Sequence, residues 1–524
     1  MARFLVAAAH KSSGKTTVSI GLAAAMTRRG LGVQPFKKGP DYIDPMWLGR
    51  AARRACYNLD FNVMTGAEIL ALWRRQSETA DDAGHPAAIN TAAAPHASAR
   101  ADVCLVEANK GLFDGVDLEG SDSNAALAKL LALPIVLVID TGGMTRGIAP
   151  LIQGYKGFDP DISIIGVILN NVGGPRHEGK LRAAMERYTD VPVLGAVGRD
   201  RTLAIGERHL GLTTPGELSL LDDKINAIAD AVAAGVDVPA LIARAEAFSM
   251  KQPPLPLSAP AAQTKAGQPP PPGQPLKPAP APALMVKSGV RIAIARDAAF
   301  GFYYPDDLAA LQAAGAELVP FNTMADAHLP QADGLFVGGG FPETHMRELA
   351  ANISLRGEIR RAIEAGLPAY AECGGLMYLC RSLGWNGRTA EMVGVIAGDA
   401  VMNQRPQGRG YARLKELAPM PWPALSAGGE AAANAGGKGG AGGADAGAGA
   451  DAGAIFAAHE FHYASVEALE PTVQFAYEVL RGHGIDGQHD GIIQHNLLAS
   501  FTHLRDTAAN HWCARFIAFV RAKS

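Results

Sequence analysis

A short turn between an apolar strand and a helix carries the residue types needed for phosphate chemistry. The strand expected over Phe4 to Ala8 runs into Ala9-His-Lys-Ser-Ser-Gly14-Lys15-Thr16-Thr17. Backbone N–H groups of such a loop surround phosphate oxygens, the lysine reaches the terminal phosphates, and the threonine hydroxyl binds Mg²⁺. Ala9 stands where the usual pattern has its first glycine, so the alternative is a turn with a chance Gly-Lys-Thr. The order of strand, loop and helix favours ATP binding, with contacts from Ser13, Gly14, Lys15, Thr16 and Thr17.

Two carboxylates and a lysine pair follow at positions suited to this loop. Asp44 lies in Phe36-Lys-Lys-Gly-Pro-Asp-Tyr-Ile-Asp-Pro45, and Glu107 ends an apolar strand. Mg²⁺ prefers hard carboxylate and hydroxyl oxygens, so Thr16, Asp44 and Glu107 are the expected metal ligands. The alternative is that Asp41 and Asp44 cap a turn beside Gly39. Lys37 and Lys38 favour the ligand role because ammonium groups neutralise charge on a transferring phosphoryl group, and Lys37 is the expected ATP contact.

A second candidate centre is a cysteine between a strand and two glycines, in Glu372-Cys373-Gly374-Gly375. A thiolate at a helix N-terminus is stabilised by the backbone dipoles, and glycines let a substrate carbonyl approach closely. Most cysteines are inert and buried, and this interpretation is kept for Cys56, Cys104, Cys380 and Cys513. Cys373 is the predicted nucleophile.

The thiol needs a base and a site for a developing oxyanion. An alternating strand expected from Ile492 to Thr502 ends at His503, which is the candidate base, while His459 and His462 are competitors. The segment Gly338-Gly-Gly-Phe-Pro-Glu343 also follows a strand and can offer unblocked N–H groups. The predicted oxyanion-stabilising residues are Gly339, Gly340 and Gly374.

Both centres lie where short β-branched runs alternate with helix-length segments. The runs include Val103 to Glu107, Ile135 to Asp140 and Ile164 to Asn170, and the rhythm restarts with Arg291 to Ala295. This alternation predicts α/β structure with parallel sheets, and ligands then bind beyond the carboxyl ends of the strands.

Changes in amino-acid composition along the chain indicate where the domains begin and end. We expect a nucleotide-binding domain over 1–249, a disordered Pro/Ala-rich linker over 250–289, and a second domain over 290–524 with a disordered Gly/Ala insertion at 426–453.

Composition also narrows the class of function. The chain has 524 residues, a formal net charge of -3 and five cysteines. That charge gives no broad field for nucleic acid or anionic lipid, and so few thiols fit a reducing compartment. No export signal or membrane-spanning run is evident at the start. We therefore expect a cytoplasmic enzyme of small-molecule chemistry that binds neither nucleic acid nor membrane.

At this point the motifs resemble those of one family, the cobyrinic acid a,c-diamide synthases of corrinoid biosynthesis. The resemblance covers the whole ordered chain. The most specific segments are Gly39-Pro-Asp-Tyr-Ile-Asp-Pro45 and Ala299-Phe-Gly-Phe-Tyr-Tyr304. The further matches are the phosphate loop, Asn58-Leu-Asp60, Gly111-Leu-Phe-Asp-Gly115, Arg208-His-Leu-Gly-Leu212, Gly339-Gly-Phe-Pro-Glu343, Glu372-Cys-Gly-Gly-Leu-Met-Tyr-Leu379 and His459-Glu-Phe-His462.

The resemblance implies a P-loop NTPase-like domain of the dethiobiotin-synthetase kind, followed by a class I glutamine amidotransferase domain. ATP with Mg²⁺ would phosphorylate the a and c acetates of a corrinoid, and ammonia released from glutamine by Cys373 and His503 would replace each phosphate. It also implies acceptor contacts from Asp41 and Tyr42 and an adenine-side role for Asn170, next to Asn171. Arg505 departs from the pattern, because related amidotransferases carry Glu there.

Two rival interpretations remain open at this stage. A cobyric acid synthase would amidate other side chains of the same macrocycle, and the Gly-Pro-Asp-Tyr-Ile-Asp segment argues against it. A nucleotide-driven switch of the partitioning-ATPase kind would leave the second domain degenerate, and intact Cys373 and His503 argue against that. The sequence leaves open whether the acceptor is cobyrinate, metal-free hydrogenobyrinate or a related nickel tetrapyrrole. It also leaves open which acetate reacts first and whether the chain forms a homodimer.

Overall fold

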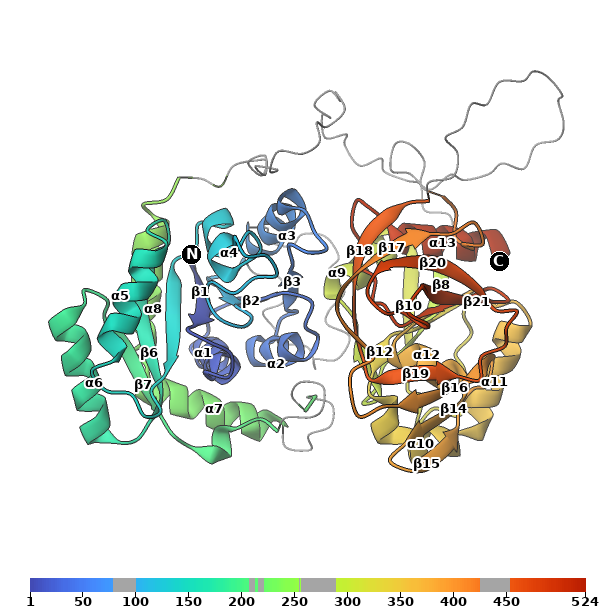
Figure 1. Cartoon of the computed structure of the whole chain (residues 1–524), viewed down its shortest axis with the longest axis horizontal. Coiled ribbons are helices and arrows are strands. Elements are labelled where there is room, and N and C mark those ends of the chain that lie inside the picture. Colours follow the sequence, from blue (N-terminus) through green and yellow to red (C-terminus); the bar gives the residue numbers. More distant parts are fainter. Residues whose placement is uncertain (79–99, 207–212, 215–220, 254, 256–288, 425–452) are drawn as a thin grey trace, which may run out of the picture.

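The computed structural model describes residues 1–78, 100–206, 213–214, 221–253, 255, 289–424 and 453–524. The predicted linker and the predicted insertion lie almost entirely outside these residues, and so does the segment 208–212. Figure 1 shows two α/β halves that face each other.

The N-terminal half is built on a seven-stranded sheet in which every pairing is parallel. Its order is β3-β2-β4-β1-β5-β6-β7, so β1 lies at the centre and the loop that follows β1 emerges at the middle of the carboxyl edge. The strands are β1 (Ala2–Ala8), β2 (Val33–Lys38), β3 (Tyr57–Leu59), β4 (Val103–Glu107), β5 (Ile135–Asp140), β6 (Ile164–Val172) and β7 (Val193–Gly198).

Helices cover both faces of this sheet, because its strands are apolar on both sides. One face packs against α1 (Lys15–Arg28), α2 (Ile43–Ala52), α7 (Leu221–Gly235) and α8 (Val238–Ser249). The other packs against α3 (Gly66–Glu78), α4 (Asn124–Leu130), α5 (Ile148–Phe158) and α6 (Pro175–Tyr188). The result is a three-layer arrangement, as predicted.

The C-terminal half has a nine-stranded sheet that is parallel on one side and antiparallel on the other. Its parallel part is β10 (Ala316–Phe321), β8 (Val290–Ala295), β11 (Gly334–Val337), β13 (Ala369–Glu372) and β22 (Leu497–Ser500). The antiparallel part continues through β21 (His489–Gln494), β20 (Gln474–Arg481), β17 (Gly408–Glu416) and β18 (Ile455–His462). The α/β class is thus confirmed for both halves, with an antiparallel extension that the sequence did not suggest.

Smaller elements complete the C-terminal half. The helices α9 (Pro305–Ala313) and α13 (Trp512–Lys523) share one apolar cluster, and α10 (Met346–Ala351), α11 (Ile353–Glu364) and α12 (Gly374–Leu379) share another. The latter cluster also takes in a four-stranded sheet of β15 (Arg388–Glu391), β14 (Cys380–Trp385), β16 (Ile396–Met402) and β19 (Ala464–Glu467). A short pair, β9 (Phe300–Phe302) and β12 (Gly339–Gly340), lies apart from these sheets.

The strand predicted over Ile492 to Thr502 is wrong in extent. Two antiparallel strands, β21 and β22, occupy that stretch, and Gln494 pairs with Leu497 across a two-residue turn. His495 takes a left-handed φ of 54° in that turn, which reverses the chain. Histidine is one of the residues that tolerates this conformation, but it is a weak turn signal beside glycine, so the apolar run reads as continuous.

The two halves share buried side chains. One apolar cluster contains Phe302, Tyr304 and Phe341 of the C-terminal half together with Ile43, the first residue of α2, and Tyr42, which precedes it. Figure 1 shows α2 and β3 on the side of the N-terminal half that faces α9 and β18. The loop between β2 and α2 therefore lies against the C-terminal half.

Two candidate active sites

The phosphate loop has the backbone geometry that its sequence predicts. Gly14 is the N-cap of α1 with φ 83°, a left-handed conformation that glycine adopts at no steric cost. Lys15 starts the helix and is 7% exposed, and its burial, reinforced by the Lys37 charge, lowers its pKa to about 8. Asn170 donates from Nδ2 to the Ser13 carbonyl at 2.9 Å, so it braces the loop. Its expected contact with ATP stays a prediction.

Thr16, Lys37, Asp44 and Glu107 come together beside this loop, as predicted. The Thr16 hydroxyl donates to Glu107 Oε1 at 2.7 Å and lies 3.4 Å from Asp44 Oδ2. Lys37 Nζ lies 2.6 Å from Asp44 Oδ2 and 3.2 Å from Glu107 Oε1. Because burial alone would lower the pKa of Lys37, the two carboxylates are what raise it above its usual value. The ammonium is therefore charged beside the loop.

The same oxygens fit Mg²⁺. Glu107 Oε2 is buried and has no hydrogen-bond partner within the described part of the chain, and burial raises the pKa of this carboxylate. An unpaired, desolvated carboxylate oxygen next to a hydroxyl and a second carboxylate is a donor set that a hard divalent cation satisfies. Thr16, Asp44 and Glu107 remain the predicted ligands.

Asp41 and Tyr42 occupy the loop before α2. Asp41 Oδ1 accepts from the N–H groups of Ile43 at 2.8 Å and Asp44 at 3.2 Å, so it caps the helix start. Burial and the Asp44 charge raise its pKa to about 7. Tyr42 is 8% exposed and its ring lies against the C-terminal half, 5.1 Å from the His503 ring. Their proposed contacts with an acceptor are not tested by this geometry.

Cys373 lies at a sharp turn between β13 and α12. Its backbone is strained, with φ 49° and ψ -103°, and it is the N-cap of α12. This is the geometry of a nucleophile elbow, which holds a reactive atom at the start of a helix. Gly374 follows as the first helical residue, whose N–H has no acceptor inside the helix.

His503 is the histidine that pairs with this thiol. It is 4% exposed, and its Nδ1 lies 3.3 Å from Glu372 Oε2, which leaves Nε2 for Cys373. Burial lowers the pKa of His503, but hydrogen bonds with Cys373 and Glu372 outweigh it and raise the pKa to about 10. His503 is therefore an imidazolium beside the Cys373 sulfur.

Glu372 is a functional residue that the sequence reasoning missed. It ends β13 directly before Cys373, and its Oε1 accepts from the Tyr370 hydroxyl at 2.6 Å and the Leu504 N–H at 2.9 Å. These two bonds hold Oε1, and the contact with His503 holds Oε2. A signal was present, because an ionisable residue ending an otherwise apolar strand is costly to bury unless it is paired.

The competing histidines lie nearby in other roles. His459 forms an isolated bridge with His503, and their rings stack at 5.0 Å. Burial, helped by the His503 charge, lowers its pKa well below the usual value, so His459 is neutral. His462 stacks on Phe501 at 3.9 Å and shares Nδ1 with the Ala464 carbonyl. Neither histidine is seen to contact both a carboxylate and the Cys373 thiol, as His503 does.

The predicted oxyanion glycines adjoin the thiol. A Cβ on Gly339 would lie 2.6 Å from His503 Cε1, and one on Gly374 would lie 2.9 Å from the Gly340 nitrogen. The absence of side chains is what lets these segments approach each other and the histidine. Which N–H groups hold an oxyanion stays a prediction.

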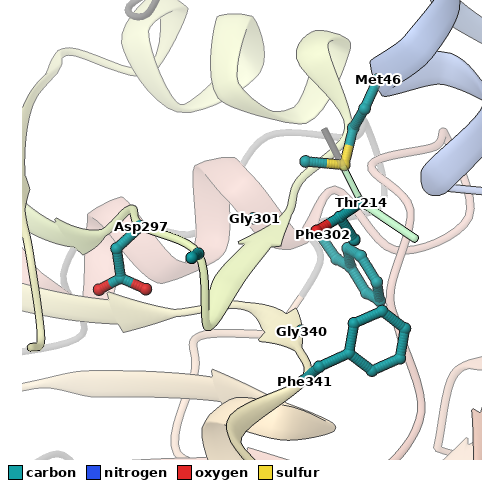
Figure 2. Close-up of a pocket in the computed structure, with 8 residues that line it drawn as sticks. Met46, Thr214, Asp297, Gly301, Phe302, Gly340 and Phe341 are labelled. Carbon is teal, nitrogen blue, oxygen red and sulfur yellow. The ribbon is translucent and has the colours of Figure 1, made fainter. Parts of the chain in front are cut away.

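Two small cavities adjoin at Gly340 and Phe341. One, about 20 Å³, contains Cys373 in its wall, together with Met377 and Tyr463. The other, also about 20 Å³, lies between the halves of the chain, and Figure 2 shows Met46 of α2 extending toward Thr214 and Phe302 there. Each has room for about one molecule of the size of water or ammonia.

Arg505 stands where related amidotransferases carry a carboxylate, and it does not contact the histidine side chain. It is 2% exposed, and its Nη2 forms ion pairs with Asp306 at 2.5 Å. The same Nη2 donates to the Asn58 carbonyl of the N-terminal half at 3.0 Å. Glu372 is the carboxylate that contacts His503, and Arg505 bridges the two halves.

The fold and the two clusters define a glutamine amidotransferase fused to a nucleotide-binding domain. Residues 4–212 match the CobQ/CobB/MinD/ParA nucleotide binding domain, and residues 291–510 match the CobB/CobQ-like glutamine amidotransferase domain. The chain belongs to the cobyrinate a,c-diamide synthase family, as the sequence motifs predicted.

Three curated relatives carry that family name. The protein from Magnetococcus marinus is 40% identical over 99% of this chain and 97% of its own length. The protein from Methanosarcina acetivorans is 38% identical over 97% of this chain and 93% of its own, and that from Listeria monocytogenes is 34% identical over 96% of each. Among the described residues, no helix has the length and apolar character needed to cross a membrane.

Proposed function

We propose that this protein converts the a and c acetate carboxylates of cobyrinate into amides, using ATP and ammonia taken from glutamine. The observation that carries the proposal is the closeness of the two centres. The loop of residues 39–44 carries Asp44, which pairs with Lys37, and Tyr42, whose ring lies 5.1 Å from the His503 ring. Glutamine cleavage and carboxylate activation would therefore meet at one loop.

In the glutaminase step, the Cys373 thiolate attacks the side-chain carbonyl of glutamine. The N–H groups of Gly340 and Gly374 would stabilise the oxyanion, and His503 would give its proton to the departing ammonia. Water then hydrolyses the thioester and releases glutamate. Glu372 holds His503 in the orientation and the charge state that this proton transfer needs.

In the synthetase step, a carboxylate oxygen of the acceptor attacks the γ-phosphorus of ATP, giving an acyl phosphate and ADP. Lys15 and Lys37 would neutralise charge on the transferring group. Mg²⁺ held by Thr16, Asp44 and Glu107 would supply further positive charge when bound. Ammonia then attacks the acyl phosphate and displaces phosphate, which leaves the amide.

The adjoining cavities at Gly340 and Phe341 would form the first part of a route for ammonia, from Cys373 to the boundary with the N-terminal half. Phe341 and Phe302 stand edge to face at 5.2 Å along this route, and apolar walls would keep ammonia unprotonated and away from bulk water. We propose residues 1–249 as the synthetase domain and 290–524 as the glutaminase domain, in a cytoplasmic enzyme without nucleic-acid partners.

The test is direct. Purified protein is incubated with ATP·Mg²⁺, glutamine and either cobyrinate or hydrogenobyrinate, and the products are identified by mass spectrometry and NMR. We expect a monoamide and then a diamide at the a and c positions. Amides at other side chains would favour a cobyric acid synthase activity instead, and ATP hydrolysis without amide formation would refute a synthetase.

A further inference from the structure

Arg505 links the glutaminase base to the synthetase loop through a continuous set of contacts. It lies two residues after His503, and the intervening Leu504 is fixed because its N–H donates to Glu372 Oε1. Its guanidinium carbon lies 4.3 Å above the Tyr304 ring, and its Nε and Nη2 hold Asp306. A buried, planar cation held on three sides has little freedom to move apart from the strand end that carries it.

The other end of this link is Asn58 of β3. Its carbonyl accepts from Arg505 Nη2, while its side-chain Nδ2 donates to the carbonyls of Gly39 and Asp41, each at 2.7 Å. Asn58 is 1% exposed, so water does not compete for these bonds. The 39–44 loop is therefore linked to residues 503–505 in two ways. Tyr42 packs against the His503 ring, and Asn58 binds both the loop and Arg505.

Arg505 and Asp60 are oppositely charged groups on the two sides of this interface. Arg505 Nη1 and Asp60 Oδ2 are both buried, and neither has a hydrogen-bond partner among the residues that the structure describes. They belong to opposite halves of the chain, and the Arg505 charge is among the influences that oppose the burial-driven rise in the pKa of Asp60. A buried polar atom without a partner costs free energy, and a shift of the interface that paired these two atoms would recover it.

We propose that Arg505 is a positioning residue that couples the two half-reactions. When ATP and the acceptor occupy the synthetase site, the 39–44 loop and β3 shift so that Arg505 pairs with Asp60, and His503 is then held in its productive position. Ammonia release thus depends on the acceptor site. This inference rests on the proposed function and adds to it the route by which one site controls the other.

The test separates coupling from catalysis by comparing three rates in each variant. These are glutamate release with glutamine alone, glutamate release with ATP·Mg²⁺ and cobyrinate added, and amidation with ammonium chloride as the nitrogen source. For Arg505→Met, we expect stimulation of glutamate release to fall by about tenfold or more, within the usual range of coupling between sites. The basal rate and the ammonium-supported rate should stay within about threefold of the parent, below a typical coupling effect.

Further variants keep the inference falsifiable. Arg505→Lys retains the charge but loses the fork that reaches Asn58, so it should also uncouple, and it decides the question if Arg505→Met does not fold. Asp60→Asn should reduce stimulation in the same direction. Glu68→Ala is the matched control, because it removes another bond across the interface, the one that Glu68 Oε1 accepts from the Ala508 N–H, without involving Asp60 or His503.

The outcomes distinguish the two proposals. If the parent does not amidate cobyrinate even with ammonium chloride, the proposed function is wrong. If the parent amidates but shows no stimulation, or if the Arg505 variants keep the parental stimulation, the coupling role is wrong. Equal uncoupling by Glu68→Ala would also overturn it, because general loosening of the interface would then suffice.

Discussion

Glu372 Oε2 lies 3.3 Å from His503 Nδ1, so the residue directly before the proposed nucleophile contacts the proposed base. In this arrangement one turn of chain carries both the thiol and the carboxylate, and only the histidine comes from elsewhere. Any displacement of Cys373 therefore also moves the group that orients its base. This explains how the site works with an arginine at position 505.

Neutralising Glu372 should change the pH dependence of glutamine cleavage. Burial lowers the pKa of His503, and Cys373 and Glu372 together raise it to about 10, so its proton is present at neutral pH and lost as the pH rises through that value. In Glu372→Gln the pKa falls, so the alkaline limb of kcat/KM moves to lower pH. The rate at neutral pH should drop on the order of 10²-fold.

The measurement is glutamate release against pH in the parent and in Glu372→Gln. Amidation supported by ammonium chloride serves as the control, because it does not use His503. An unchanged alkaline limb would mean that Glu372 does not raise the pKa of His503.

Gly339→Ala should damage the glutaminase without harming the synthetase. The new Cβ would lie 2.6 Å from His503 Cε1 and 3.3 Å from Phe302, and neither ring is free to retreat. Misplacing a catalytic group by about 1 Å costs about 10²-fold in rate. Gly384→Ala is the matched control, since its Cβ would meet nothing closer than 3.8 Å. Equal glutaminase rates in the two variants would contradict the close approach of Gly339 to the base.

The sequence predicted the parts of the site that are local in the chain. Gly14 and Lys15 end the loop that follows a central strand, and Cys373 lies between a strand and a helix, so short motifs define both their backbone and their surroundings. Such strand-turn-helix patterns are readable because each residue's role depends on its immediate neighbours.

The missed features depend on contacts between distant segments. Glu372 meets His503 across 131 positions, and Arg505 meets Asn58 across 447, so no spacing rule could reveal either pair. Tyr42 is a similar case, because its place against His503 follows from how the two halves dock. Sequence patterns carry information on burial and turns, whereas these contacts depend on the tertiary arrangement.

Cys373→Ser should abolish glutamine-dependent amidation while leaving ammonium-dependent amidation intact. A serine hydroxyl stays protonated beside His503 and is a poor nucleophile there, so glutamate release should fall by at least about 10³-fold. Cys380→Ser is the control, because burial raises the pKa of that thiol and keeps it inert seven residues away. Glutamine-dependent product at the parental rate from Cys373→Ser would refute the proposed nucleophile.

Glu107→Gln should weaken the synthetase and spare the glutaminase. Glu107 accepts from Thr16 and pairs with Lys37, and its Oε2 is the unpaired oxygen proposed for Mg²⁺, so loss of its charge removes a ligand while Lys37 keeps Asp44. We expect the Mg²⁺ concentration for half-maximal activity to rise and kcat/KM for ATP to fall by about tenfold or more. Asp102→Asn, an exposed carboxylate just before β4, is the control. Basal glutamate release should be unchanged in both variants, and a parental Mg²⁺ requirement in Glu107→Gln would exclude this residue as a ligand.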